Sequence, residues 1–146
     1  MTDKNFISVI LIEPGKEPKT VQIEDELKAM QELVGGYIEE YMPFEDDVAI
    51  ICNEEGKLLN LSSNRAIYNT DGDSSIKDEA EKKIVDIIQG PFFLCYAPAD
   101  SETFQSLPED LAKKYKDRFK KPEKFIIKSG KLTALCYDPK PKEHER

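Results

Sequence analysis

Apolar residues in this sequence fall into short runs that are flanked by turn-forming residues. Three runs contain almost only apolar side chains and are predicted to form buried strands: Phe6–Ile12, Val48–Cys52 and Phe92–Tyr96. Five further segments are shorter or alternate apolar with polar positions, and are predicted as their partners: Lys19–Ile23, Tyr37–Met42, Lys57–Leu61, Lys124–Ile127 and Leu132–Tyr137. Because most neighbouring strands are joined by short connections, we expect mainly antiparallel pairing.

Glycine and polar clusters predict where the chain turns. Gly56 follows Asn-Glu-Glu and is placed for the left-handed position of a tight hairpin, after which the chain is expected to return along Lys57–Leu61. Ser129 and Gly130 predict a second hairpin between the last two strands. Ser62–Ser75 is polar and is predicted to be rich in turns.

Apolar residues at helical spacing predict two or three helices. The first covers Leu27–Val34, with the acidic segment Glu24–Glu26 before it and Gly35 at its end. Lys77–Ile88 is expected to start as a helix and to bury its apolar end. A further helix is predicted from Leu107 to about Phe119, since a proline is tolerated in the first turn.

This pattern predicts one α+β domain over residues 1–137, built mainly on an antiparallel sheet and followed by a disordered charged tail at residues 138–146. A length of 146 residues is that of one domain with one core. No apolar stretch approaches the roughly 20 residues of a membrane-spanning helix, and the first residues lack the features of a secretory signal. We therefore expect a cytoplasmic protein with no membrane partner.

The cysteines and the single histidine do not form a chemical motif. Cys52, Cys95 and Cys136 are far apart in the sequence and each lies within an apolar run, so we expect all three to be buried hydrophobic residues. His144 lies in the charged tail, which makes a Cys/His pair geometrically unfavourable. The sequence predicts no metal site and no cofactor.

Charge is distributed unevenly along the chain. The net charge is −8, but residues 1–112 carry −15 and the segment Lys113–Lys131 carries +7. The basic segment is expected to fold back on the acidic body and neutralise it; the alternative is that it binds the phosphates of a nucleic acid. Tyr115 and Phe119 are spaced to face the core, so the segment lacks stacking aromatic residues.

Five carboxylates lie within nine residues of the acidic part: Glu39, Glu40, Glu45, Asp46 and Asp47. On a rigid scaffold such carboxylates could imitate the phosphates of a nucleic acid and form an acidic surface for a partner. The alternative is a solvated strand edge and turn.

A second candidate site combines amide and charged side chains: Asn53, Glu54, Lys57, Asn64 and Arg65. Two polar turns separated by one short strand would bring them together at one end of the sheet. Arg65 would then offer a planar guanidinium to a phosphate or carboxylate, oriented by Asn53 and Asn64. The alternative is structural: the asparagines cap turns and Arg65 pairs with a neighbouring acid.

Motifs of common enzymes and calcium-binding loops are absent. An EF-hand alignment of the segment around Gly72 would place Ile67 at the first ligand position, where an oxygen is required. Gly15 and Lys16 lack the leading glycine of a phosphate-binding loop, and no nucleophile elbow occurs. We therefore expect that the protein is not an enzyme.

Four motifs in order resemble the domain-of-unknown-function family 3846: Glu32–Glu39, Cys52–Leu58, Asn64–Ala66 and Asp86–Phe93. The resemblance covers about Phe6 to Tyr96 and departs from the family at Asn60–Ser63, where a Gly-Leu-Pro type turn is expected. It implies a protein of phages, plasmids or other bacterial mobile elements that acts in the cytoplasm of a bacterial host, and it implies no known activity.

These observations favour a non-catalytic accessory protein of a mobile element that binds and blocks a host component, such as a host-defence protein. The first alternative is a protein that binds or sequesters a small anionic ligand such as a nucleotide. The second alternative is a nucleic-acid-binding regulator that uses the basic segment, although its lack of stacking aromatic residues argues against nucleic acid.

Overall fold

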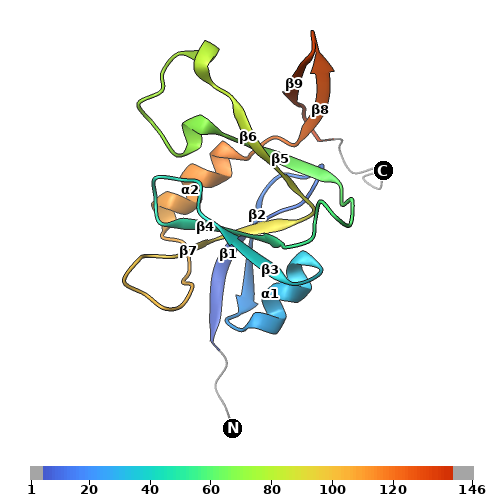
Figure 1. Ribbon diagram of the computed structural model, residues 1–146. Helices are drawn as coiled ribbons and strands as arrows, with labels where there is room; N and C mark the ends of the chain where they lie inside the picture. Colours follow the sequence, from blue (N-terminus) through green and yellow to red (C-terminus); the bar gives the residue numbers. More distant parts are fainter. Residues whose placement is uncertain (1–4, 140–146) are drawn as a thin grey trace, which may run out of the picture.

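A five-stranded antiparallel sheet forms the centre of the protein in the computed structural model, which describes residues 5–139 (Figure 1). The strand order is β2-β1-β7-β4-β3. The bounds of these strands are Phe6–Ile12 for β1, Lys19–Glu24 for β2, Ile38–Tyr41 for β3, Val48–Asn53 for β4 and Phe92–Tyr96 for β7. The predicted buried strands are therefore confirmed, and they occupy the three inner positions of the sheet.

Helices cover the two faces of this sheet separately. Helix α1 (Leu27–Val34) packs Met30 and Val34 on one face, and Gly35 ends it in the left-handed conformation, as predicted. Helix α2 (Glu109–Arg118) covers the other face with Tyr115 and with Phe119, which follows it. The two helices lie on opposite sides of the sheet (Figure 1). The chain is thus a single small α+β domain.

A second, two-stranded sheet lies beside α2 and corrects two predictions. Strand β5 (Ser63–Tyr68) occupies part of the segment that was predicted to be rich in turns, and β6 (Ile84–Gln89) replaces the end of the expected helix. Two short 3₁₀ helices of one turn each lie between these strands: η1 (Asn69–Asp71) and η2 (Glu79–Glu81). The two strands pair in an antiparallel ladder, and Ile67 of β5 and Ile88 of β6 place their side chains in the core, which outweighs the polar flanks.

The segment after β4 is also different from the prediction. Residues 54–60 form consecutive turns rather than a hairpin and a returning strand. The Leu59 amide donates to the Glu55 carbonyl and the Leu61 amide to the Gly56 carbonyl. The left-handed residue is Asn60 (φ 58°) and not Gly56. Gly56 is needed for a different reason: it packs against the backbone of β6, so the prediction of its conformation was wrong.

A C-terminal hairpin projects from the body at the top of Figure 1. It consists of β8 (Glu123–Lys128) and β9 (Lys131–Cys136), and the two residues of its turn, Ser129 and Gly130, both have positive φ. This is the backbone of a type I′ turn, and the predicted hairpin is confirmed.

The hairpin explains the one error about the cysteines. Cys52 and Cys95 are buried in the central sheet as predicted, whereas Cys136 is exposed because β9 lies outside the main core. His144 and most of the predicted tail lie outside the described residues. Between residues 5 and 139 there is no helix of sufficient length and apolar character to cross a membrane.

Candidate functional site

Strand β3 lies at one edge of the central sheet. Among the residues that the structure describes, β4 is the only strand that pairs with it. The Glu54 amide donates to the Tyr37 carbonyl at 2.8 Å, which fixes which residues of β3 bond to β4. Since hydrogen-bonded and non-bonded pairs alternate in an antiparallel ladder, the backbone groups of Ile38 and Glu40 point to the open edge. This edge can accept another strand.

The side chains along β3 suit contact with a protein. Tyr37 precedes the strand and is 68% exposed, and Met42 follows it and is 43% exposed. Between them Glu39 and Glu40 are exposed on opposite faces of the strand. Aromatic and methionine side chains are enriched in protein interfaces, so the edge carries two anchors and two negative charges.

A hollow of about 190 Å³ lies beside β3, between this strand and β6. Its charged groups are three carboxylates and one ammonium, from Glu39, Glu54, Asp86 and Lys57. The ammonium is already engaged, because Lys57 Nζ donates to Asp86 Oδ1 at 2.9 Å and to the Ile87 carbonyl at 3.1 Å. The hollow is therefore acidic and suits a positively charged group rather than an anion.

Two further side chains of the hollow have raised pKa values. Burial raises the pKa of the Cys52 thiol to about 11, and the carboxylates of Glu39 and Asp86 add to the effect. Burial is also the main cause of the raised pKa of Tyr41, with Asp86 the largest charge contribution. Both groups are protonated at neutral pH, so Cys52 is not an activated nucleophile.

Asn53, one of the predicted site residues, lines the hollow but uses its side chain to hold the fold. Its Nδ2 donates to the Val34 carbonyl at 3.3 Å, and its Oδ1 accepts from the Glu55 amide at 2.8 Å. Gly36 lies so close that a Cβ there would be 2.8 Å from Asn53 Nδ2. Asn53 therefore ties the end of α1 to the turn after β4, which agrees with the structural alternative.

The structure does not bring Asn64 and Arg65 to this hollow. Both are fully buried, and Asn64 Nδ2 donates to the Ile12 and Gly90 carbonyls, each at 2.9 Å. The Arg65 guanidinium donates to the carbonyls of Phe119 and Lys16 and to Asn64 Oδ1. The expectation that Arg65 offers a free planar fork to a ligand is therefore wrong, because its donors already bond to groups of the protein.

The five clustered carboxylates do not form one surface either. Glu39 and Glu40 lie on β3, and Asp47 is exposed in the loop before β4. Glu45 accepts from the Ser74 amide at 2.8 Å, and Asp46 accepts from Lys114 Nζ and from the Tyr115 hydroxyl. The expected acidic surface thus reduces to the exposed pair on β3, with the carboxylates of the hollow beside it.

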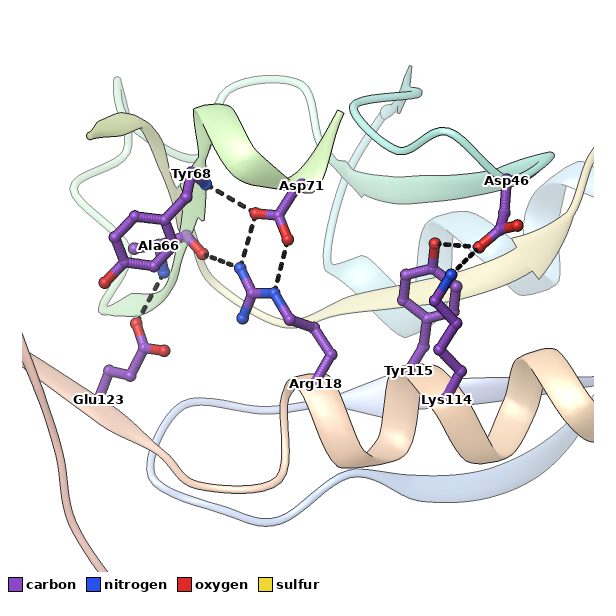
Figure 2. A network of polar contacts seen from close by, with 8 residues as sticks. All are labelled: Asp46, Ala66, Tyr68, Asp71, Lys114, Tyr115, Arg118 and Glu123. Carbon is purple, nitrogen blue, oxygen red and sulfur yellow. Dashed lines mark hydrogen bonds and ion pairs between the residues drawn. The ribbon is translucent and has the colours of Figure 1, made fainter. Parts of the chain in front are cut away.

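Helix α2 is held to the acidic body by a network of charged groups (Figure 2). Arg118 donates from Nε and Nη2 to the two carboxylate oxygens of Asp71, at 2.6 and 2.7 Å, and from Nη2 to the Ala66 carbonyl. The carboxylate of Glu123 accepts a hydrogen bond from the amide of the same residue, Ala66. The basic segment therefore folds back in part, as expected, through Lys114 and Arg118.

Glu123 gives a prediction about pH. Burial raises the pKa of this carboxyl above its ordinary value of 4.5, so the folded protein holds the proton more tightly than the unfolded chain. The charged form is the penalised one, and this group makes the protein less stable as pH rises through the interval between the two pKa values. Glu123→Gln keeps an acceptor for the Ala66 amide and removes the penalty. We expect the variant to gain stability relative to the wild type as pH rises from 4 to 8, measured by urea unfolding. A difference that is constant or falls with pH would argue against this account.

Gly56 gives a second prediction. A Cβ at this position would lie 2.8 Å from the backbone oxygen of Gln89, and a backbone atom cannot move aside as a flexible side chain can. We expect Gly56→Ala to lower the free energy of unfolding by about 1–3 kcal/mol through overpacking. Glu55→Ala, at an exposed residue of the same turn, should change it by less than about 0.5 kcal/mol. Equal effects of the two substitutions in urea unfolding would show that the close approach is not needed.

The described residues hold no group of three metal-ligating side chains that could bind a metal ion, and this includes the carboxylates of the hollow. Sequence reasoning found Asn53, Glu54 and Lys57 but missed Tyr41, Asp86 and Gln89. The signal for the last two was present in the fourth motif, Asp86–Phe93, which lies in space beside the second.

The family comparison agrees with this arrangement of motifs. Residues 7–120 match the model of a family described as a domain of unknown function, DUF3846. The match includes the central sheet, both helices and the β5–β6 pair, and ends before the C-terminal hairpin. No curated protein and no solved structure matches the chain.

Proposed function

The chain belongs to the DUF3846 family, whose description assigns no activity, and we propose from the geometry of β3 that it is a non-catalytic protein-binding module. Its target is a host protein that contributes an extended, positively charged segment. The observation that carries this proposal is the open, acidic edge of β3, with exposed Tyr37 and Met42 at its two ends.

The backbone of β3 supplies the first part of the interaction. A partner segment in extended conformation adds a strand to a sheet edge by hydrogen bonds to the outward amides and carbonyls, here those of Ile38 and Glu40. Tyr37 and Met42 then provide apolar contacts at the two ends of the added strand.

Charge supplies the specificity. Glu39 belongs both to the exposed edge and to the hollow, so an arginine or lysine of the added strand can reach from the edge into the hollow. Inside, Glu54 and Asp86 add negative charge next to Glu39. An acidic partner is repelled by the same groups, so the surface discriminates by sign.

A role in binding small anions, the alternative from the sequence, has less support. It depended on Arg65, which is buried, and the hollow that holds Asn53, Glu54 and Lys57 has an excess of negative charge. A role as an accessory protein of a phage or mobile element that blocks a host component is compatible with a surface of this kind, and it remains part of the proposal.

The test uses a charge reversal on β3. Binding of a short, fluorescent peptide of alternating arginine and valine is measured by anisotropy for the wild type and for Glu39→Lys/Glu40→Lys. We expect the double substitution to weaken binding by about tenfold or more, which corresponds to 1.4 kcal/mol. The same pair of variants is then used as bait in extract of the host, where the wild type should capture a protein that the double variant does not.

A matched control carries the same change of charge elsewhere. Asp100→Lys/Glu102→Lys alters two exposed acids in the loop after β7 and should retain both the peptide and the captured protein. Equal binding by wild type and the β3 variant, or equal loss in the control, would contradict the proposal. Unchanged thermal midpoints of both variants exclude unfolding as the cause.

A further inference from the structure

A groove separates the C-terminal hairpin from the rest of the molecule. One part, of about 550 Å³, lies between β9 and the segment from η2 to the start of β6. A second part, of about 320 Å³, continues along β6, and the two parts share Ile84 and Leu132. The groove is therefore continuous and runs between β6 and β9. Its larger part shares no lining residue with the hollow beside β3, whereas its smaller part borders that hollow at Lys57, Asp86 and Gln89.

Aliphatic side chains form the floor of this groove. Val85 on β6 is 56% exposed, and Leu132 on β9 is 41% exposed. Ile127 lies outside the lining of the groove, but it is directly opposite Leu132 in the hairpin register and is 68% exposed, so it extends the apolar surface of the hairpin. Ala134 lines the groove two positions further along β9. An isolated two-stranded hairpin is only marginally stable, so apolar surface left open on it is expected to have a partner.

Lysines form the rim. Lys82, Lys83 and Lys131 line the larger part of the groove, against one carboxylate, that of Glu79. None of these three lysines forms a salt bridge within residues 5–139. The rim therefore has an excess of positive charge in a protein whose net charge is −8.

We infer that the groove between β6 and β9 is a docking site for a segment of a partner protein that carries both acidic and apolar side chains. The aliphatic floor receives the apolar side chains, and the lysines of the rim pair with the carboxylates. The lysines that define this site line the larger part of the groove, which shares no residue with the hollow beside β3, and they select the opposite charge from the proposed function of β3. The hairpin lies beyond residues 7–120, so one wall of the groove is not part of the matched family domain.

A nucleic acid fits the groove less well than a protein segment does. Bases need exposed aromatic faces on which to stack. The aromatic ring in the groove is that of Tyr68, and it is covered: Lys82 Nζ lies 4.4 Å from its centroid and the Arg118 guanidinium carbon 5.6 Å from it. The aliphatic floor contributes to the binding of leucine or valine side chains and contributes little to a phosphate backbone.

The test uses a short fluorescent peptide that alternates glutamate and leucine, with both ends blocked. We expect the full chain to bind it, and Lys82→Glu/Lys83→Glu/Lys131→Glu to bind about tenfold or more weakly. Val85→Asp tests the floor separately and is also expected to weaken binding. The control Lys113→Glu/Lys116→Glu/Lys120→Glu makes the same change of charge on and after α2, outside the groove, and should bind as the wild type does.

Other outcomes overturn the inference. Equal binding by the wild type and the groove variants would show that the groove is not the site. Equally tight binding of polyglutamate would show that the apolar floor is not used, and tighter binding of oligothymidylate would identify a nucleic-acid site. Self-association that the groove variants abolish would make a second copy of the chain the occupant. Because this peptide and the β3 peptide have opposite charges, failure of one test leaves the other interpretable.

Discussion

Arg65→Ala is expected to lower the free energy of unfolding by about 3–5 kcal/mol, the range for breaking a buried charged network. The guanidinium is fully buried and bonds to three different parts of the chain, through Lys16, Asn64 and Phe119. Alanine leaves the Phe119 and Lys16 carbonyls without their buried donors and opens a cavity in the space that the guanidinium fills. Urea unfolding followed by circular dichroism measures the effect.

Arg65→Lys is the informative companion variant. A lysine keeps the charge, but its single ammonium cannot reproduce the planar fork that serves acceptors in several directions. We expect a loss smaller than that of Arg65→Ala and still above about 1 kcal/mol. If both variants were as stable as the wild type, Arg65 would not be a structural residue, and its role as a ligand-binding residue would have to be reconsidered.

Arg118→Ala is expected to cost about 3 kcal/mol, because it leaves the Asp71 carboxylate without its charged partner. The Asp71 side chain is 8% exposed, so water does not replace the two hydrogen bonds that Arg118 donates. The same substitution frees the end of α2 from the Ala66 carbonyl of β5. Thermal or urea unfolding of the variant gives the measurement.

Two controls accompany this variant. Lys113→Ala changes an exposed residue of the same helix and should alter stability by less than about 0.5 kcal/mol. The double variant Arg118→Met/Asp71→Asn removes both charges and should lose less than Arg118→Ala alone, since no unpaired charge stays buried. Two results would disagree with the geometry in Figure 2. One is an Arg118→Ala variant as stable as the wild type, and the other is a double variant that loses more stability than Arg118→Ala.

The elements that the sequence predicted well are those whose burial follows from local pattern alone. Strands β1, β4 and β7 are almost entirely apolar, α1 repeats apolar residues at helical spacing, and Gly35 ends it. The turn at Ser129 and Gly130 is specified by the two residues themselves. In each case one feature dominates and no distant contact competes with it.

The prediction failed where distant contacts decide. Lys77–Ile88 starts with residues that favour a helix, yet Ile84–Gln89 pairs with β5 in a strand. Ser63–Tyr68 contains polar residues because Asn64 and Arg65 are used inside the protein, where their donors meet backbone carbonyls. A sequence cannot indicate that a buried arginine has such partners, since they come from positions far along the chain.

The candidate site was only partly visible in the sequence for the same reason. Asn53, Glu54 and Lys57 lie within five consecutive residues and were found together, while Asp86 and Tyr41 reach the same hollow from other strands. The sign of the charge at the hollow was also unpredictable, because it depends on which acids and bases the fold brings together. Because the fold buries Arg65 away from the hollow, the charged groups that line the hollow favour a cation rather than the anion expected from the sequence.

The central claim is that β3 is an open edge that receives a strand from a partner, and amide hydrogen exchange tests it most directly. In the free protein, the amides of Ile38 and Glu40 should exchange fast, while those of Glu39 and Tyr41, which face β4, should be protected. On addition of the alternating arginine–valine peptide or of the captured host protein, the exchange of Ile38 and Glu40 should slow by about tenfold or more. Slow exchange of these two amides in the free protein, or no change on binding, would contradict the account.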